Sequence, residues 1–198
     1  MSYKAIDVVL LPDKKMNEFA MKANCELVTE FDSEIVLNHK DCLPHISLLM
    51  GGINDKDIKE ISSILGGFTN MTPKTLIPDH IKKIQNASGK ITSVIQIKRT
   101  DKLQKLHEIV CDTLKKYLTF DISIEMIAGG KVSQTTIEWI KNYPANSSYR
   151  NFSPHITIGY GDLSGRKMPR IFKVSKLAIC RLVDHCTCKE ILWSAGIQ

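Results

Sequence analysis

The chain has 198 residues, of which 43% are hydrophobic and 24% are charged, and its 27 Lys and Arg against 21 Asp and Glu give a formal net charge of +6. This composition is typical of a folded domain and excludes disordered, collagen-like and small disulfide-stabilised proteins. The chain starts without a hydrophobic signal core, and no apolar run approaches the roughly 20 residues of a membrane span. We therefore expect a cytoplasmic protein without a membrane partner, with its six cysteines reduced.

The first half of the chain alternates apolar, strand-like runs with amphipathic segments. An apolar run at 6–11 predicts a strand, and the helix-like spacing of apolar residues at 14–24 predicts a helix. A second strand is expected at 45–50, closed by a glycine turn at 51–52. A helix with Asn54 as its N-cap is expected to follow and to end at the next pair of glycines.

The second half combines one clear helix with several strands. The helix is expected at 100–118, where apolar residues form one stripe beside lysines. The other expected elements, in chain order, are a hairpin of segments 74–81 and 91–98 around a turn at 86–89, a strand at 121–128, a turn at 129–130, a short helix at 133–142, a polar loop at 144–153, a strand from Pro154, and two strands between 172 and 193 that meet near Asp184. This order predicts a strand-rich α+β fold.

One short motif occurs twice in the chain. The two copies read Pro-His-Ile-Ser-Leu at 44–48 and Pro-His-Ile-Thr-Ile at 154–158. Because successive side chains of a strand alternate between its faces, His45 and Ser47 are expected on one face, and His155 and Thr157 on one face of the second strand. Each strand therefore presents one imidazole and one hydroxyl together, while the isoleucine between them anchors the strand in the core.

Two imidazoles in one cleft suit the chemistry of a phosphodiester with a neighbouring ribose hydroxyl. Such a reaction needs a base to activate the nucleophile and an acid to protonate the leaving oxygen. With an ordinary pKa near 6.5, one histidine can be neutral while the other is protonated at the same pH. The hydroxyls of Ser47 and Thr157 are suited to donate to phosphate oxygens. This scheme requires no metal and no cofactor.

The paired motifs resemble those of the 2H phosphoesterase superfamily, which includes the RNA 2',3'-cyclic phosphodiesterases also called 2',5' RNA ligases. The resemblance implies a bilobal, pseudo-twofold α+β fold over residues 1–198, with an antiparallel sheet flanked by helices in each lobe and a central cleft. It implies metal-independent hydrolysis of 2',3'-cyclic phosphate or 2',5'-linked RNA ends or nucleotides, with 2',5' RNA ligase activity as the reverse reaction. It assigns acid and base roles to His45 and His155, and phosphate binding to Ser47 and Thr157.

Residues near the second motif are candidates for substrate binding. Tyr149, Phe152 and Tyr160 are of the type that stacks on bases, and Arg150 is suited to a phosphate, although core packing explains the aromatic residues equally well. Many members of the resembled superfamily carry a basic residue shortly after the second motif, and this chain does not. Arg150 or Lys131 are candidates to replace it.

Other interpretations of the sequence remain open. The chain is alternatively a non-catalytic module that binds nucleotide or RNA in the same cleft, or a cyclic phosphodiesterase for a small metabolite such as ADP-ribose cyclic phosphate. The run 184–188 contains zinc-ligand types but lacks a second ligand pair, so no metal site is expected there. His39, His80 and His107 are expected in surface or capping roles. We expect a monomer whose partners are RNA ends or small cyclic-phosphate nucleotides.

Overall fold

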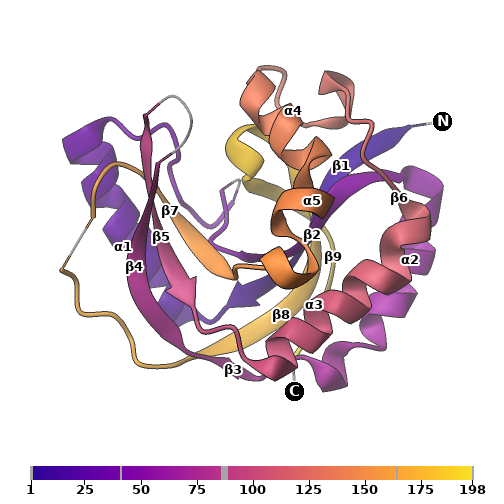
Figure 1. The fold of residues 1–198 in the computed structure, drawn as a ribbon, viewed down its shortest axis with the longest axis horizontal. Helices are drawn as coiled ribbons and strands as arrows, with labels where there is room; N and C mark the ends of the chain where they lie inside the picture. The colour runs from indigo at the N-terminus through magenta and orange to yellow at the C-terminus, as the bar shows by residue number, and fades with distance from the viewer. Residues whose placement is uncertain (1, 41, 86–88, 164, 198) are drawn as a thin grey trace.

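The computed structural model of the chain describes residues 2–40, 42–85, 89–163 and 165–197. Within these ranges the strands form two antiparallel sheets, one of six strands and one of three (Figure 1). The larger sheet contains β1 (Tyr3–Pro12), β2 (Ile46–Asn54), β3 (Thr75–Leu76), β6 (Leu118–Thr119), β8 (Phe172–Leu182) and β9 (Cys188–Gly196). The smaller sheet contains β4 (Pro78–Gln85), β5 (Ile91–Ile97) and β7 (His155–Tyr160). The helices are α1 (Lys14–Phe31), α2 (Ile58–Gly66), α3 (Asp101–Leu114), α4 (Gln134–Lys141) and α5 (Tyr143–Ser147).

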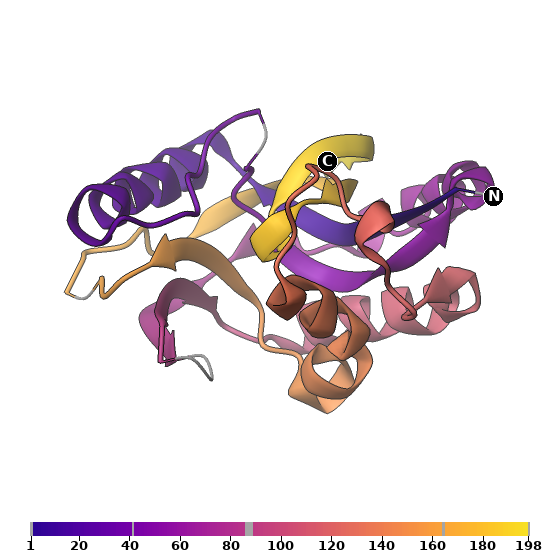
Figure 2. The ribbon, with the colours of Figure 1, turned by 90° about the horizontal axis from the view of Figure 1, so that it is seen from above.

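The two motif strands belong to different sheets. The larger sheet has the order β3-β8-β1-β2-β6, with β9 paired to β8, and the smaller has the order β4-β5-β7. Helix α1 packs on β7 and α3 packs on β2, so each helix covers the motif strand from the other half of the chain. Seen from above, the larger sheet twists through the middle of the molecule, with α1 at one end and α2 at the other (Figure 2). The predicted α+β class with antiparallel sheets is confirmed.

The principal helices begin where the sequence predicts. The Asp13 side chain caps α1 by accepting from the amide of Met16 at 2.9 Å, and Thr100 caps α3 in the same way. The Asn54 side chain accepts from the amide of Lys56 at 3.2 Å at the start of the turn that leads into α2. Among the described residues, no helix combines the length and the apolar character that a membrane crossing needs.

The core explains why the motif strands sit where they do. Ile46 and Leu48 on β2 and Ile156 and Ile158 on β7 have 0% exposure and belong to one hydrophobic cluster that reaches both sheets. Burying these alternate side chains removes roughly 25 cal/mol of unfavourable hydration per Å² of apolar surface. The burial leaves the intervening polar side chains on the opposite face of each strand, as the period of two requires.

The predicted turn at Gly51 and Gly52 is wrong, because β2 continues through both residues to Asn54. The glycines are needed for close packing instead of for a turn. A Cβ on Gly52 would lie 2.8 Å from the Thr119 methyl carbon and 3.2 Å from Ile122. The missing side chain therefore lets β6 and the segment that follows it approach the edge of the sheet.

Two further expectations in the second half are wrong. Residues 121–128 form no strand; a single turn of 3-10 helix, η4 (Ile124–Met126), folds the segment back and still buries Ile122 and Ile127. The predicted loop at 144–153 contains α5 and the short η5 (Tyr149–Asn151), because a proline near the N-terminus of α5 favours helix initiation. The predicted hairpin of segments 74–81 and 91–98 is confirmed in part: β4 and β5 pair, but the first strand runs over Pro78–Gln85, and Thr75–Leu76 form β3, which pairs with β8. Residues 86–88 of the turn lie outside the described residues.

Candidate active site

The polar residues of both motifs lie on the half-buried faces of their strands. His45 directly precedes β2 and Ser47 lies on it, whereas His155 and Thr157 lie on β7. All four are partly accessible, and the apolar residues between them are fully buried. The predicted alternation is therefore confirmed for both copies.

The two histidines have the same local hydrogen bond. Nδ1 of His45 lies 2.7 Å from the carbonyl oxygen of Leu43, and Nδ1 of His155 lies 2.7 Å from the carbonyl oxygen of Ser153. A carbonyl oxygen can only accept, so Nδ1 carries a hydrogen in both rings. In the neutral form of each ring, Nε2 therefore has a free lone pair, and this is the atom that can accept a proton in general base catalysis.

Each motif strand contains a β-bulge at the same motif position. In the β1–β2 pair, Val8 and Val9 oppose Leu49 and Ser47, so Leu48 is the extra residue. In the β5–β7 pair, Ser93 and Val94 oppose Gly159 and Thr157, so Ile158 is the extra residue. A bulge leaves one residue without its ladder partner and re-aims the side chains that follow. The repeat seen in the sequence thus extends to backbone irregularities that the sequence did not reveal.

Buried side chains from α1 and α3 bind the carbonyl oxygens of the bulged residues. His107 on α3 donates from Nδ1 to Leu48 at 2.8 Å, and Asn24 on α1 donates from Nδ2 to Ile158 at 2.7 Å. His107 has 0% exposure, so the predicted surface or capping role for it is wrong. Its Nε2 also accepts from the amide of Tyr149, which leaves this imidazole fully bonded and structural.

The surroundings of both motif imidazoles lower their pKa. Burial lowers the pKa of His45 to about 4, with a smaller lowering from the nearby charge of His155. Burial also lowers the pKa of His155, with a further lowering from the positive charge of Lys82. The charge of a protonated His155 thus contributes to the lowered pKa of His45.

Asp7 is a site residue that the motif analysis missed. Its carboxylate is fully buried on β1, accepts a 2.5 Å hydrogen bond from the Ser47 hydroxyl, and has Oδ2 3.6 Å from Nε2 of His45. Burial raises the pKa of Asp7 well above its ordinary value, against the opposing effect of the Ser47 hydrogen bond. A single acid inside the apolar run 6–11 was the signal that could have identified it, because a buried carboxylate is costly unless other polar groups bind it.

Lys82 is the second residue that was missed. It pairs with Val94 across the β4–β5 ladder, and Val94 pairs with Thr157 across the β5–β7 ladder. Residues opposite each other in a ladder share a face, so Lys82 lies on the face that carries Thr157 and His155. Lys82 lies near the second motif because the strands have the order β4-β5-β7. The motif analysis could not predict this, because Lys82 is far from the second motif in the sequence.

Tyr160 lies on the motif face because of the bulge. It pairs with Thr92, two residues from the partner of Thr157, so both side chains emerge on one face. Its hydroxyl lies 3.0 Å from Nδ1 of His185, and the Lys90 ammonium sits 3.7 Å from the ring centroid. Because Lys90 covers one ring face, a base can stack only on the other.

The remaining predicted binding residues lie elsewhere. Phe152 is 3% exposed and stacks on His107 with ring centroids 4.0 Å apart, which places it in the core. The Tyr149 hydroxyl donates to Asp112 on α3 at 2.9 Å. Arg150 is exposed, and its backbone carbonyl accepts from Arg99. The hydrogen bond of the Tyr149 side chain thus goes to α3 and not to a motif residue.

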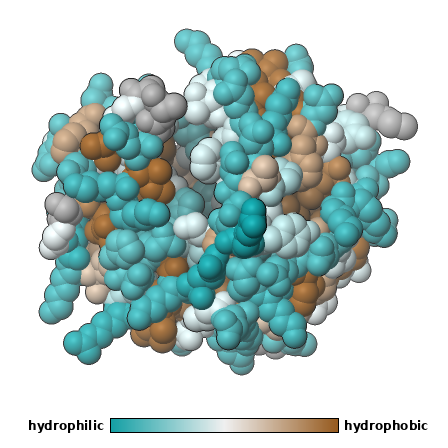
Figure 3. All heavy atoms as spheres, in the orientation of Figure 1, coloured by the Kyte–Doolittle hydropathy of each residue, from teal (hydrophilic) through white to brown (hydrophobic). Residues whose placement is uncertain are grey.

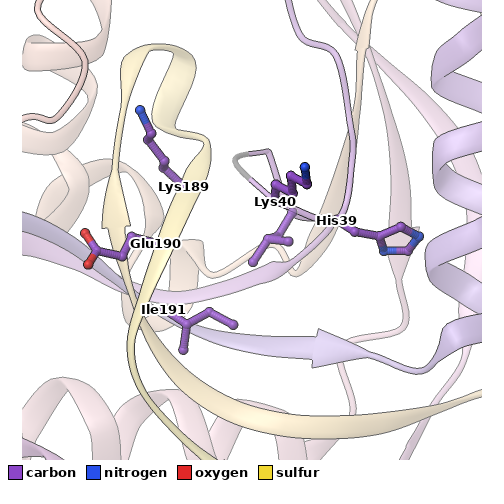
Figure 4. Close-up of a pocket in the computed structure, with 6 residues that line it drawn as sticks. His39, Lys40, Lys189, Glu190 and Ile191 are labelled. Atoms are coloured by element: carbon purple, nitrogen blue, oxygen red, sulfur yellow. The ribbon is translucent and has the colours of Figure 1, made fainter.

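The surface is hollowed in several places. In the space-filling view a recess lies between the side formed by α1, β4 and β5 and the side formed by α4 and α5 (Figure 3). A depression of about 470 Å³ lies at the start of β9. Its polar side chains His39, Lys40 and Glu190 point in different directions and do not meet at one point (Figure 4). A second hollow of about 370 Å³ includes Lys131 and His185. His45 and His155 line neither of these two hollows. The candidate site is therefore defined by the motif side chains and not by a pocket.

One group of side chains near His45 has the composition of a metal site. Ligand atoms of Asp7, His45 and Cys188 lie within 4.8 Å of one another. Cys188 belongs to the run 184–188, which forms η6 (Asp184–Cys186) and the start of β9. The other two members of the group, Asp7 and His45, come from β1 and from the first motif.

Comparison with known proteins adds no relative. No protein-family model matches the chain, and no curated protein matches it. The likeness to the 2H phosphoesterase superfamily therefore stays a prediction that rests on the motif residues.

Proposed function

We propose that this protein is a metal-independent phosphodiesterase that hydrolyses 2',3'-cyclic phosphate or 2',5'-linked ends of RNA or small nucleotides. The observation that carries the proposal is the matched geometry of the two motifs. Each presents an imidazole whose Nδ1 is held by the carbonyl two residues earlier, and a hydroxyl on the same half-buried face. Two imidazoles with the same local geometry, one of which influences the pKa of the other, are suited to paired acid and base roles.

In the proposed reaction His45 is the base and His155 the acid. His45 has its pKa lowered to about 4, so its Nε2 is unprotonated and accepts a proton from water. The water oxygen forms a new bond to phosphorus, and the bond from phosphorus to one ribose oxygen breaks. His155, in the molecules that carry a proton on its Nε2, donates this hydrogen to the departing ribose oxygen. Because its pKa is lowered, this form of His155 becomes more abundant as the pH falls. Each proton transfer contributes roughly 10²–10⁴-fold to the rate.

The hydroxyls and Lys82 bind the phosphate in this proposal. Thr157 donates to a non-bridging oxygen, and Lys82 neutralises charge on the same face of the small sheet. Ser47 is engaged with Asp7, whose raised pKa favours a protonated carboxyl. A protonated Asp7 donates to Ser47 Oγ and thereby frees the serine hydrogen for the phosphate. Lys82 thus takes the place that the sequence offered to Arg150 or Lys131.

The test is hydrolysis of nucleoside 2',3'-cyclic phosphates and 2',5'-linked dinucleotides with a chelator present. We expect turnover by the native chain and a loss of at least about 10²-fold in His45→Ala and in His155→Ala. His80→Ala is the matched control, because this exposed histidine lies outside the site and should leave turnover unchanged. Full activity in either motif variant would contradict the mechanism.

The same substrate panel separates the alternative functions. Turnover of a small cyclic metabolite such as ADP-ribose cyclic phosphate, but not of RNA ends, would identify a metabolite phosphodiesterase. Salt-sensitive nucleotide binding without any turnover would instead identify a binding module.

A further inference from the structure

Three side chains with different ligand atoms meet beneath the first motif. Asp7 on β1, His45 before β2 and Cys188 on β9 each offer one ligand atom, and these atoms lie within 4.8 Å of one another. Asp7 and Cys188 have 0% exposure. Neither Asp7 nor Cys188 belongs to the repeated motif, and the reaction proposed above does not use the Cys188 thiol.

One carboxylate oxygen of this group has no hydrogen-bond donor among the described residues. Oδ2 of Asp7 lies 3.6 Å from Nε2 of His45, beyond hydrogen-bond distance. Because Nδ1 of His45 carries the hydrogen bound to Leu43, Nε2 of the neutral ring directs a lone pair toward this region. The other carboxylate oxygen, Oδ1 of Asp7, is buried and has no hydrogen-bond partner among the described residues. Oδ2 accepts from the Ser47 hydroxyl, so Oδ1 is the buried acceptor without a donor, and a bound cation would satisfy it.

The donor set suits zinc. Zn²⁺ takes imidazole nitrogen, thiolate sulfur and carboxylate oxygen at about 2.0–2.3 Å, so its ligand atoms lie about 3.3–3.8 Å apart in a tetrahedral site. The 3.6 Å between Asp7 and His45 already falls in this range. Mg²⁺ and Ca²⁺ prefer oxygen ligands, and a nitrogen and a sulfur in a set of three disfavour them.

We propose that Asp7, His45 and Cys188 form an inhibitory Zn²⁺ site beneath the candidate active site. Zinc bound there occupies Nε2 of His45, the atom that accepts the proton of water in the proposed function, on which the inhibitory part of this inference rests. The fourth position of the ion is left for water or a phosphate oxygen. Binding zinc releases the thiol proton of Cys188 and the carboxyl proton of Asp7, because the ligands are the thiolate and the carboxylate.

The metal site is tested without any substrate by adding Co²⁺ and then Zn²⁺ to the full chain under a phosphine reductant. We expect a near-ultraviolet thiolate-to-cobalt absorption band in the native chain, which zinc abolishes by displacement. Cys188→Ser should lose the band and weaken zinc binding by at least about tenfold. Cys186→Ser is the matched control, since this neighbouring cysteine lies outside the group and should keep the band.

A second variant is needed in case Cys188→Ser misfolds, because Cys188 is fully buried. Asp7→Asn removes the carboxylate ligand and should also weaken zinc binding, with far-ultraviolet circular dichroism reporting the fold of both variants. A native chain without the thiolate band, or a folded Cys188→Ser that keeps it, would overturn the site.

Inhibition is measured separately on cyclic nucleotide hydrolysis. We expect added Zn²⁺ to suppress turnover, a chelator to restore it, and Cys188→Ser to retain turnover while losing zinc sensitivity. Zinc binding through Cys188 in a chain that hydrolyses no substrate would support the metal site and overturn the proposed function. Full turnover with zinc bound would support the proposed function and overturn the inhibition.

Discussion

Asn24 on α1 donates a 2.7 Å hydrogen bond to the carbonyl oxygen of Ile158 on β7, 134 residues away in the chain. Ile158 is the bulged residue that follows the hydroxyl of the second motif. His107 on α3 makes the corresponding bond to Leu48 in the first motif. Each motif strand is therefore positioned by a buried polar side chain from the opposite half of the chain, which makes formation of the site dependent on the complete fold.

Replacing Asn24 by Ala should destabilise the protein by about 3 kcal/mol. The Asn24 side chain is 2% exposed and also donates to the carbonyl oxygen of Ile35 and accepts from the amide of Leu37. Its removal breaks three buried hydrogen bonds to the backbone, each at a cost of about 1 kcal/mol or more, while the Ile35 carbonyl oxygen keeps another donor, the Ser33 hydroxyl at 3.3 Å. Urea denaturation measures the loss. Thr29→Ala, an exposed position on the same helix, should change stability by less than about 0.5 kcal/mol.

An equal stability of Asn24→Ala and the native chain would show that water replaces the lost bonds. In that case β7 would not depend on α1 for its position.

Asp7→Asn should change how stability depends on pH. The folded pKa of Asp7 is raised above the ordinary 3.8 by burial, so folding favours the protonated carboxyl. This contribution is fully present below pH 3.8 and is lost as the pH rises through the folded pKa. The stability of Asp7→Asn relative to the native chain should therefore increase from acid to alkaline pH, as measured by urea denaturation at a series of pH values.

The control for this experiment is Asp121→Asn, since the Asp121 side chain is 99% exposed. The free energy of unfolding of Asp121→Asn should depend on pH in the same way as that of the native chain. Parallel curves for Asp7→Asn and the native chain would contradict the raised pKa.

The pH dependence of kcat/KM should be a bell with its optimum below 6.5, the ordinary pKa of histidine. The acid limb reports the base and the alkaline limb reports the acid of the free enzyme. Burial lowers the pKa of both His45 and His155, so both limbs move to lower pH. Hydrolysis rates measured from pH 4 to 9 at constant ionic strength test this, and an optimum above pH 7 would count against the two-histidine assignment.

Lys82→Ala should raise KM by roughly tenfold with little change in kcat, as expected for loss of a ground-state phosphate contact. It should also move the alkaline limb of the kcat/KM profile to higher pH, because the Lys82 charge lowers the pKa of His155. The matched control is Lys83→Ala, whose ammonium pairs with Asp162 at 2.9 Å. An unchanged alkaline limb in Lys82→Ala would show that this lysine does not act on the site.

Much of the local structure was predictable because it depends on neighbouring residues. Apolar runs and helical periodicity located β1, β2, α1, α3 and β7, and the Asp13 and Thr100 caps follow from local hydrogen bonding. The strand prediction for 121–128 was wrong because a 3-10 turn buries the apolar residues of this alternating segment equally well. The candidate hydroxyls and imidazoles were found for a similar reason: alternation along a strand decides which side chains share a face.

The sequence by itself determined the two motif strands, their buried and exposed faces and the antiparallel α+β class. Only the tertiary structure decided that α1 covers β7 and α3 covers β2, that Lys82 shares a face with Thr157, and that Asp7 and Cys188 lie beside His45. These relationships join residues far apart in the chain through strand order and bulge positions. Periodicity describes a segment's own faces, whereas packing among segments decides which of those faces meet.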